Sequence, residues 1–574
     1  MNTEKKTLER LLITLALLSC IGFSAFLLWL QDKQEADREQ LSGQREEPQA
    51  GQIQGTYDQP MQIRTRLTAD PSGEQPVFSL PGGFYPEEIT VEITAPEGCR
   101  IYYTTDGTKP GEDNGTLYEG PVEVTNVCGS PNVYSAVSTV SAYQNYAPLT
   151  TVDKAVVLQA VAVDADGMES AVTCASYFIA MEGKAMYRSL PVLSVTTEPA
   201  GLFDYFEGIY VAGVDYENAL ASNELRSDSA NYYRGGEISA HIEYFETDRY
   251  LTYEGDVTLT LCKDGNLDYG QKSFLFTEAE PVIDDTCELY PYFRNGTMML
   301  YGGGTDHAMK SRQCLEEELL RGREQGFLSE AMSGCMVFVD GEFWGLYLMR
   351  EAIRPESLAE RAGCAVEEIR MVENAYPSAP EYGELYRLVT VQNAGSEKIY
   401  RQILEQMDVD SFLEYYCANL YFGNPQFDSF STTVWRQEGE DSVGKWHWEF
   451  NDATDTLGRN SLSNYSVNTY LCPQVAGDLF FQGLLKNPDF AESFRRRMQA
   501  YADEWTREQV EEVLTPILEK YRVAVTVTAQ RYGVQQTEEG YLADGDTILT
   551  YFDRRGEYIL RYTQELLNRN AETE

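Results

Sequence analysis

The feature that most constrains this chain is an uncharged apolar run near its start. Residues 11–30 include no charged side chain. A helix of twenty residues is about 30 Å long, which is enough to span the hydrocarbon core of a membrane. Basic residues precede the run and acidic residues follow it, which keeps residues 1–10 in the cytoplasm and the rest outside. The sequence therefore predicts a single-pass protein of the cell membrane with its C-terminal bulk extracytoplasmic.

A cleaved signal peptide is the alternative interpretation of this run. Signal peptides have a shorter apolar region that ends in small residues, whereas this run ends Leu-Leu-Trp-Leu. A retained transmembrane helix therefore fits the pattern better. Residues 31–76 are polar, rich in Gln, Glu and Gly, and without apolar periodicity, so we expect a flexible stalk there.

The charge balance limits the partners of the extracytoplasmic part. The chain has 45 Lys and Arg against 91 Asp and Glu, a net charge of −46. Nucleic acid is bound by basic surfaces, so we expect no nucleic-acid partner. The three His residues and the absence of a Cys-x-x-Cys pair argue against a multi-histidine metal site and a zinc ribbon.

Residues 77–180 have the pattern of a small antiparallel β-sandwich. Short β-rich runs at 89–94, 100–107, 156–167 and 174–180 alternate with turns. Two of the turns carry Asp-Gly, a dipeptide typical of hairpins.

The segments FYPEEITVEIT, IYYTTDGTKP, LYEGPVEVT and LQAVAVDADGMES resemble the chitobiase/β-hexosaminidase C-terminal-type domain of bacterial surface proteins. An insertion around residues 129–151 departs from that pattern. The resemblance implies an accessory or spacer module. Stacking of Tyr102, Tyr103 and Tyr118 on cell-wall glycan is one interpretation, and ordinary sheet positions are the other.

The first candidate for chemistry is an acidic loop that follows an aromatic strand. Trp446, Trp448 and Phe450 alternate along the chain, so they lie on one face of a strand. The loop after them contains Asp452 and Asp455. Carboxylates just past a strand end can converge on one divalent cation that is shared with phosphate. A tight acidic turn is the alternative.

Two further segments have features of phosphate binding. Gly303 and Gly304 belong to a glycine-rich loop before a helix that we expect over residues 312–323, and such a loop can cradle an anion. The segment is no P-loop, because it lacks the Gly-Lys-Ser/Thr ending. Lys272 stands between a Gly-containing loop and a strand expected at 273–276. It can reach a phosphate there, or it can be a solvated lysine at the strand edge.

Two more segments supply candidate catalytic groups. A β-hairpin is expected at 336–349, and Glu351 at its end could pair with a lysine. Residues 410–436 read as an apolar helix, broken at Asn424-Pro425, followed by a loop with Asp428 and then a strand. Helix, polar loop, strand and acidic loop in this order are typical of a catalytic loop followed by a metal loop.

From about residue 190 to 568 the chain resembles the CotH kinase-like family of spore-coat and surface proteins. The motifs are LPVLSVTTEPAGLFD, QKSF, GGGTD with SRQCLEEEL, VFVDGEFWGLYLMRE, NLYFGNPQFDSFSTTVWR and GKWHWEFNDATDTLGRN. The resemblance implies an atypical protein-kinase-like domain of two lobes, with ATP between them and Mg²⁺ or Mn²⁺. It also implies phosphorylation of Ser or Thr on surface or coat proteins. The expected fold class of the chain is α+β.

The resemblance also assigns roles by position. Lys272 takes the role of the ATP-phosphate lysine, Glu351 is its helper, and Asp452 is the metal-binding aspartate. The remaining candidates are Asp428 and Asn424 in the catalytic loop, Gly303, Gly304 and Arg312 at the cofactor, and Asp455 as a second metal ligand.

Several reactive positions depart from the family pattern. The second acidic position falls on Thr454, and the expected loop aspartate falls near Gln426. Losing such groups costs orders of magnitude in rate, so the departures predict weakened or lost catalysis. A catalytically degenerate pseudokinase that acts as a surface scaffold is therefore the alternative to an active kinase. A glycan-binding surface protein is a third hypothesis.

Overall fold

The computed structural model describes residues 75–226, 228–262, 267–278, 281–306, 308–323, 332–373, 382–439, 443–450 and 455–573. The predicted tail, transmembrane helix and nearly all of the stalk lie outside these residues, as does Asp452. None of the helices in these ranges combines the length and the apolar character that a membrane crossing requires. All the described residues belong to one contact unit, Met61–Glu574.

The first module consists of short strands. They are β1 (Val77–Phe78), β2 (Gly83–Tyr85), β3 (Ile89–Val91), β4 (Ile93–Thr94), β5 (Arg100–Thr104), β6 (Thr116–Leu117), β7 (Val122–Val124), β8 (Val156–Val163) and β9 (Thr173–Ile179). A five-stranded sheet has the order β2-β9-β8-β5-β6, and β1–β4 and β3–β7 form two small sheets. Val91, Val124, Leu158 and Tyr177 share one core between these sheets, as a sandwich requires.

One pairing corrects the expectation of a fully antiparallel module. Strands β2 and β9 run parallel. They are far apart in sequence and are not joined by a hairpin, so no turn forces them to be antiparallel. The other pairs of the module are antiparallel.

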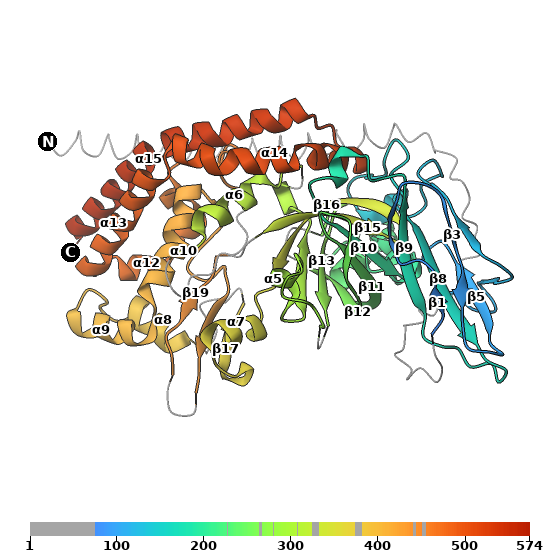
Figure 1. Cartoon of the computed structure of the whole chain (residues 1–574). Coiled ribbons are helices and arrows are strands. Elements are labelled where there is room, and N and C mark those ends of the chain that lie inside the picture. The colour runs from blue at the N-terminus through green and yellow to red at the C-terminus, as the bar shows by residue number, and fades with distance from the viewer. Residues whose placement is uncertain are drawn as a thin grey trace. The chain divides into compact units, whose positions relative to one another are not determined.

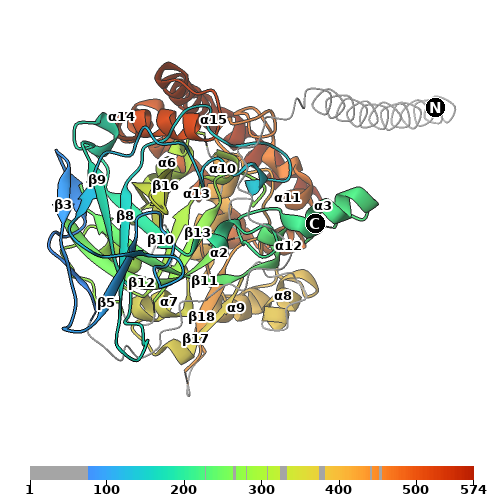
Figure 2. The ribbon, with the colours of Figure 1, turned by 90° about the vertical axis from the view of Figure 1, so that its right-hand side faces the viewer.

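Seven strands close into a barrel after the module (Figure 1). They are β10 (Val192–Thr197), β11 (Glu237–Phe245), β12 (Leu251–Cys262), β13 (Ser273–Thr277), β14 (Thr297–Tyr301), β15 (Ser333–Val339) and β16 (Glu342–Glu351), in the order β10-β11-β12-β13-β14-β16-β15. The parallel pair β10–β15 closes the ring. Short helices α2 (Pro199–Phe203), α3 (Gly213–Ser222), α4 (Asn231–Arg234) and α5 (Tyr290–Phe293) lie in its connections, and α3 stands out from the barrel in Figure 2.

Alternating side chains of the barrel strands belong to two separate hydrophobic cores. On β15, Val337 and Val339 belong to the cluster that every barrel strand shares. Met336 and Phe338 belong to a second cluster, which continues into the helices. Because side chains of a strand alternate between its faces, the first cluster fills the barrel and the second attaches the helices to its outside.

The second half of the chain is mainly helical. Its helices are α6 (Ser311–Leu320), α7 (Pro355–Ala362), α8 (Gly383–Thr390), α9 (Glu397–Gln406), α10 (Val409–Phe422), α11 (Pro473–Gly477), α12 (Leu479–Leu484), α13 (Pro488–Glu504), α14 (Arg507–Arg531) and α15 (Glu538–Thr573). A three-stranded sheet, β17 (Ile369–Val372), β18 (Val434–Gln437) and β19 (His447–Trp448), lies among them. A β-rich N-terminal region followed by a helical region confirms the α+β class.

The first module and the barrel are joined by buried contacts. The rings of Phe178 and Phe338 meet edge to face at 5.0 Å. The inserted segment at 129–151 is held from the barrel side, because the Glu342 carboxylate accepts hydrogen bonds from the backbone N–H groups of Val133 and Ser135, both at 2.7 Å. The insertion is therefore a fixed part of the fold.

Candidate functional site

The glycine-rich loop lies where β14 leads into α6. Gly303 and Gly304 have φ values of +97° and +50°, in the left-handed region that favours glycine. Gly302 lies so close to the residues just before β13 that an added Cβ would stand 2.6 Å from the carbonyl oxygen of Gln271. The predicted phosphate loop and the QKSF segment are therefore neighbours.

A group of charged residues surrounds the end of this loop, and we call it the charge cluster. Its members are Asp306, Lys310, Arg312, Glu316, Asp455, Arg459 and Asp544. Arg312 is buried, and its two Nη atoms each lie 2.6 Å from an oxygen of Asp544. Arg312 Nη1 also lies 3.1 Å from Asp306 Oδ1. This carboxylate frame holds Arg312 in place at the start of α6.

The acidic loop reaches the same cluster from far along the chain. Arg459 Nη1 lies 2.9 Å from Asp306 Oδ1, and Arg459 Nε lies 3.2 Å from Asp455 Oδ1. The Thr456 hydroxyl donates to the buried carboxylate of Glu316 on α6. The structure thus brings together the predicted cofactor residue Arg312 and the predicted metal ligand Asp455, through Asp306 and Arg459.

Burial changes the protonation of several cluster members. It lowers the pKa of Lys310 to about 7, although Asp306 and Cys314 oppose the shift. It raises the pKa of Asp306 against the influence of Arg312 and Arg459, and it raises the pKa of Glu316 well above its ordinary value. The cluster therefore includes an amine that titrates near neutral pH and two carboxyl groups that keep a proton to higher pH than exposed carboxyl groups do.

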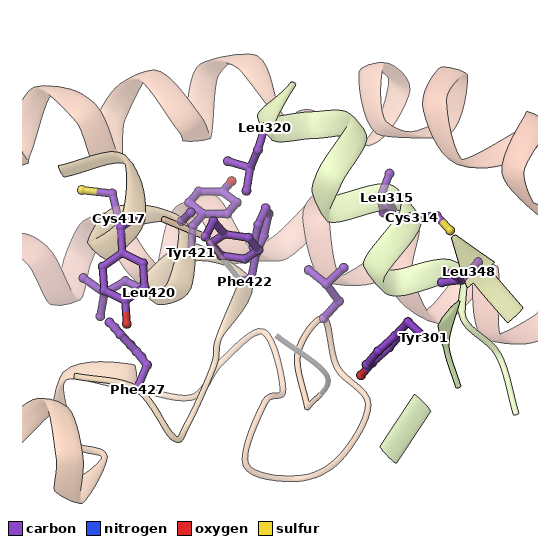
Figure 3. Packing of buried hydrophobic residues seen from close by; sticks show 14 of the residues in the cluster. Tyr301, Cys314, Leu315, Leu320, Leu348, Cys417, Leu420, Tyr421, Phe422 and Phe427 are labelled. Carbon is purple, nitrogen blue, oxygen red and sulfur yellow. The ribbon is translucent and has the colours of Figure 1, made fainter. Parts of the chain in front are cut away.

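Helix α10 and the loop after it form the neighbouring wall. The backbone N–H of Leu457 donates to the carbonyl of Phe422 at 2.9 Å, which fastens the acidic loop to the end of α10. In Figure 3, apolar side chains of α6 and α10 are seen in the common core that supports both, among them Leu320, Tyr421 and Phe422. Arg555 of α15 donates to the carbonyls of Leu420 and Tyr421, and so fixes the carboxyl end of α10.

The predicted catalytic loop follows directly, and its polar groups are engaged locally. Asn424 Nδ2 donates to Asn419 Oδ1 at 2.8 Å, and its Oδ1 accepts from the N–H of Gln426. Asp428 is half-buried, and its carboxylate accepts from the N–H of Phe430 at 2.8 Å. Within the described ranges, the hydrogen bonds of Asn424 and Asp428 do not extend to the charge cluster.

The backbone of Lys272 adjoins Gly302, but its ammonium group is bound outside the charge cluster. Lys272 is fully buried, at 0% exposure. Its Nζ donates to the carbonyls of Val140 and Leu267 at 2.6 Å and of Tyr269 at 2.9 Å. The Nζ also lies 4.2 Å from the ring centroid of Tyr232. The alternative of a solvated strand-edge lysine is therefore wrong, because the inserted segment that contains Val140 covers the side chain.

Lys272 and Glu351 do not pair, contrary to the expected helper role. The Glu351 carboxylate lies 2.8 Å from Arg361 Nη2 and 3.4 Å from Arg294 Nη2, and it also accepts from Asn295. The reason is that the predicted partner is already enclosed by carbonyl groups, whereas two arginines lie beside the end of β16. Burial lowers the pKa of Lys272 to about 7, and Asp268 opposes the shift.

The donor atoms available for a metal ion are oxygens. Asp306 Oδ2 is buried and has no hydrogen-bond partner within the described ranges, and Asp455 is half-buried beside it in the cluster. However, no group of three or more acidic, His or Cys residues in the described part of the chain could hold a metal. The predicted ligand Asp452 lies outside the described residues, so its place beside Asp455 stays a prediction.

Five members of the cluster were missed by reasoning from the sequence: Asp306, Lys310, Glu316, Arg459 and Asp544. Lys310 has a φ of +60°, a strained conformation for a lysine, and its Nζ contacts Gln271 Oε1 at 2.9 Å. Asp306 directly follows the glycine run, and that position was the available signal. Asp544 lies within a long helix, and no local motif indicates its contact with Arg312.

Two known protein families match parts of the chain. The family described as "CotH kinase protein" matches residues 271–559, just over half of the chain. The family described as "Fn3 associated" matches residues 91–177, in the module where we recognised an accessory β-domain. No curated protein matches the chain. The matched CotH segment contains the glycine-rich loop, the α10 loop and the acidic loop, and the chain therefore belongs to the CotH kinase protein family.

Proposed function

We propose that the protein is a membrane-anchored, extracytoplasmic phosphotransferase of the CotH type. It uses ATP with Mg²⁺ or Mn²⁺ to phosphorylate Ser or Thr on surface or coat proteins, with activity weakened by its substituted positions. One observation carries the proposal: Arg459 and Asp306, 153 positions apart, are in contact at 2.9 Å. This contact joins the segment suited to phosphate with the segment suited to a metal ion.

The residues divide the work between them. The backbone of Gly303 and Gly304 and the side chains of Lys310 and Arg312 bind the phosphates, whose negative charge favours the protonated form of Lys310. Asp455 and Asp452 hold the divalent cation, which neutralises phosphate charge when bound. Asp428 orients the acceptor hydroxyl, for which the loop after α10 provides an accessible carboxylate.

A second candidate function is a pseudokinase that binds a partner and transfers nothing. The observation that favours it is the state of Lys272, whose three hydrogen bonds go to carbonyl groups. A lysine held in this way does not contact a nucleotide unless the covering segment moves. The arginine partners of Glu351 also favour the pseudokinase, because this carboxylate pairs with Arg294 and Arg361 in place of the expected lysine.

Label transfer from ATP by the full-length protein tests the proposal. The protein is incubated with labelled ATP, Mg²⁺ or Mn²⁺ and a generic acceptor protein, beside Asp452→Ala and the control Asp553→Ala. Asp553 is an exposed residue of α15, outside the charge cluster. We expect transfer by the wild type and Asp553→Ala, and loss of at least about 100-fold in Asp452→Ala.

The result also separates the two candidate functions. ATP binding without transfer under either metal supports the pseudokinase. In that case the variants Gln426→Asp and Thr454→Asp, alone and together, test whether the substituted positions explain the loss. Equal transfer by the wild type and Asp452→Ala contradicts the assigned site.

A further inference from the structure

A pocket lined by tyrosines lies beside the buried Lys272, outside the charge cluster. It has a volume of about 350 Å³, within the usual range of small-molecule sites. Its walls carry Tyr143 of the inserted segment, Tyr216 of α3, and Tyr232 and Tyr233 of α4, with Ala230 between them. We call it the tyrosine pocket.

The floor of the tyrosine pocket is firmly held. The Tyr232 hydroxyl donates to Asp268 Oδ1 at 3.2 Å, and the rings of Tyr232 and Tyr233 lie 4.9 Å apart. Burial and the nearby Asp268 raise the pKa of both tyrosines, so the hydroxyl groups stay neutral. Tyr232 is only 1% exposed and has the Lys272 Nζ over its ring, so it supports the floor from beneath. The half-buried Tyr233 is therefore the prearranged tyrosine that the floor presents to the pocket.

The mouth of the pocket offers one cation and one anion. Arg226 and Asp228 both line the pocket and are exposed. Neither side chain has a hydrogen bond or ion pair within the ranges that the structure describes. The nearby Arg234 and Asp215, by contrast, are paired with each other at 2.6 Å. A guanidinium and a carboxylate thus remain available to a ligand.

We propose that the tyrosine pocket binds a neutral carbohydrate. The C–H faces of a pyranose ring pack on tyrosine rings, and its hydroxyl groups accept from Arg226 and donate to Asp228. A cationic ligand is attracted by the net charge of −46, and at the mouth of the pocket it is opposed by Arg226. An anionic ligand is opposed by Asp228 and by the net charge of −46. A polyhydroxylated ligand without charge uses both groups.

The accessory module does not offer an equivalent surface. Tyr102 is buried, and Tyr103 packs edge to face on Tyr118 at a ring distance of 6.4 Å. Tyr118 and Tyr103 pack against the core of the module. The ordinary sheet interpretation fits these three residues better, and the tyrosines suited to sugar lie in the pocket by α3 and α4.

Binding of cellotetraose and chitotetraose to the full-length protein tests the proposal, with choline and a sulfated disaccharide as charged probes. Tyr143 is 69% exposed, and the control Tyr250 is 70% exposed on the turn between β11 and β12, so removal of either ring should leave the fold intact. We expect a neutral tetrasaccharide to bind. Tyr143→Ala should weaken its binding about three- to tenfold, by loss of one aromatic contact, and Tyr250→Ala should not.

Arg226→Ala should also weaken binding of the tetrasaccharide, and the double variant with Tyr143→Ala should lose it. The proposal is overturned if neither tetrasaccharide binds at millimolar concentration, or if binding is unchanged in both single variants. It is also overturned if choline or the sulfated disaccharide binds at this pocket in place of the neutral sugars. None of these results depends on phosphotransfer, so the test is independent of the proposed function.

Discussion

Releasing the segment that covers Lys272 should expose this lysine and leave an equally buried lysine protected. The perturbation is Glu342→Ala. Its carboxylate is 4% exposed and accepts from the backbone N–H groups of Val133 and Ser135. Val140, whose carbonyl accepts from Lys272 at 2.6 Å, lies five residues after Ser135. The substitution therefore removes one anchor of the cover and touches neither Lys272 nor the charge cluster. The hydrogen bonds of Thr139 to Ala212 and of Ser141 to Asp268 remain.

The magnitude follows from the two lost hydrogen bonds. A hydrogen bond to a charged group contributes about 1.5–3 kcal/mol, so the pair contributes at least about 3 kcal/mol. Because each 1.4 kcal/mol is about a factor of ten, the open fraction of the cover should rise about 100-fold. Glu342→Gln keeps one acceptor oxygen and should give an intermediate increase.

The assay is labelling by an amine-reactive ester at about pH 8, followed by mass spectrometry of the Lys272 peptide. The lowered pKa of Lys272 belongs to the buried amine. Once the cover opens, the amine reacts as an ordinary exposed lysine does at that pH, so the labelling rate reports its exposure. Lys310 is the internal control, since its pKa is likewise lowered to about 7 and it is also buried. An unchanged labelling rate at Lys272, or an equal rise at Lys310, would refute the reasoning.

Three further changes have outcomes that the structure sets. Gly302→Ala places a Cβ 2.6 Å from the carbonyl oxygen of Gln271. It should lower the free energy of unfolding, measured by urea denaturation, by about 1–3 kcal/mol. Gly120→Ala is the control, because its added Cβ would have no atom within 4 Å. Arg555→Lys keeps the charge but loses donors to the carbonyls of Leu420, Tyr421 and Val467. It should lower the free energy of unfolding by about 2–4 kcal/mol. A loss under about 0.5 kcal/mol would contradict the role of Arg555. Glu316→Gln tests the pH dependence. The pKa of Glu316 is raised in the folded state, so its contribution is complete below the unfolded pKa and declines as pH rises. Between about pH 5 and pH 8 the variant should therefore lose less stability than the wild type. The slopes of the free energy of unfolding against pH should differ by up to about 1.4 kcal/mol per pH unit. Equal slopes would show that Glu316 is ionised in both states.

Sequence patterns of a few residues correctly predicted a hairpin and two helices. The expected hairpin appears as β15 and β16, and its turn residues Asp340 and Gly341 both have positive φ, as an Asp-Gly turn requires. The expected helix at 312–323 appears as α6, and the apolar helix before Asn424 appears as α10. The predicted common face of Trp446, Trp448 and Phe450 is buried in one core. In each case the signal lies within a few residues.

Contacts between distant segments account for what could not be predicted. The barrel closes because Val192 of β10 lies beside Met336 of β15, and no sequence periodicity specifies that parallel pair. The family resemblance placed Arg312 at the site, but its partner Asp544 comes 232 residues later. Lys272 was predicted to reach a phosphate, and its carbonyl acceptor at Val140 comes 132 residues earlier. Side chains such as these are defined by tertiary packing.

The insertion at 129–151 also bears on how this chain can be inherited and recombined. Accessory modules are commonly exchanged between proteins as independent units, which works when a linker is all that joins them. Here the segment that matches the CotH kinase protein family depends on its neighbour for one of the acceptors of a buried ammonium group. A chimaera that replaced the first module would leave this charge with an incomplete set of acceptors. The two parts should therefore be transmitted together, and related chains with a different first module should have another residue in place of Lys272 or another source of its cover.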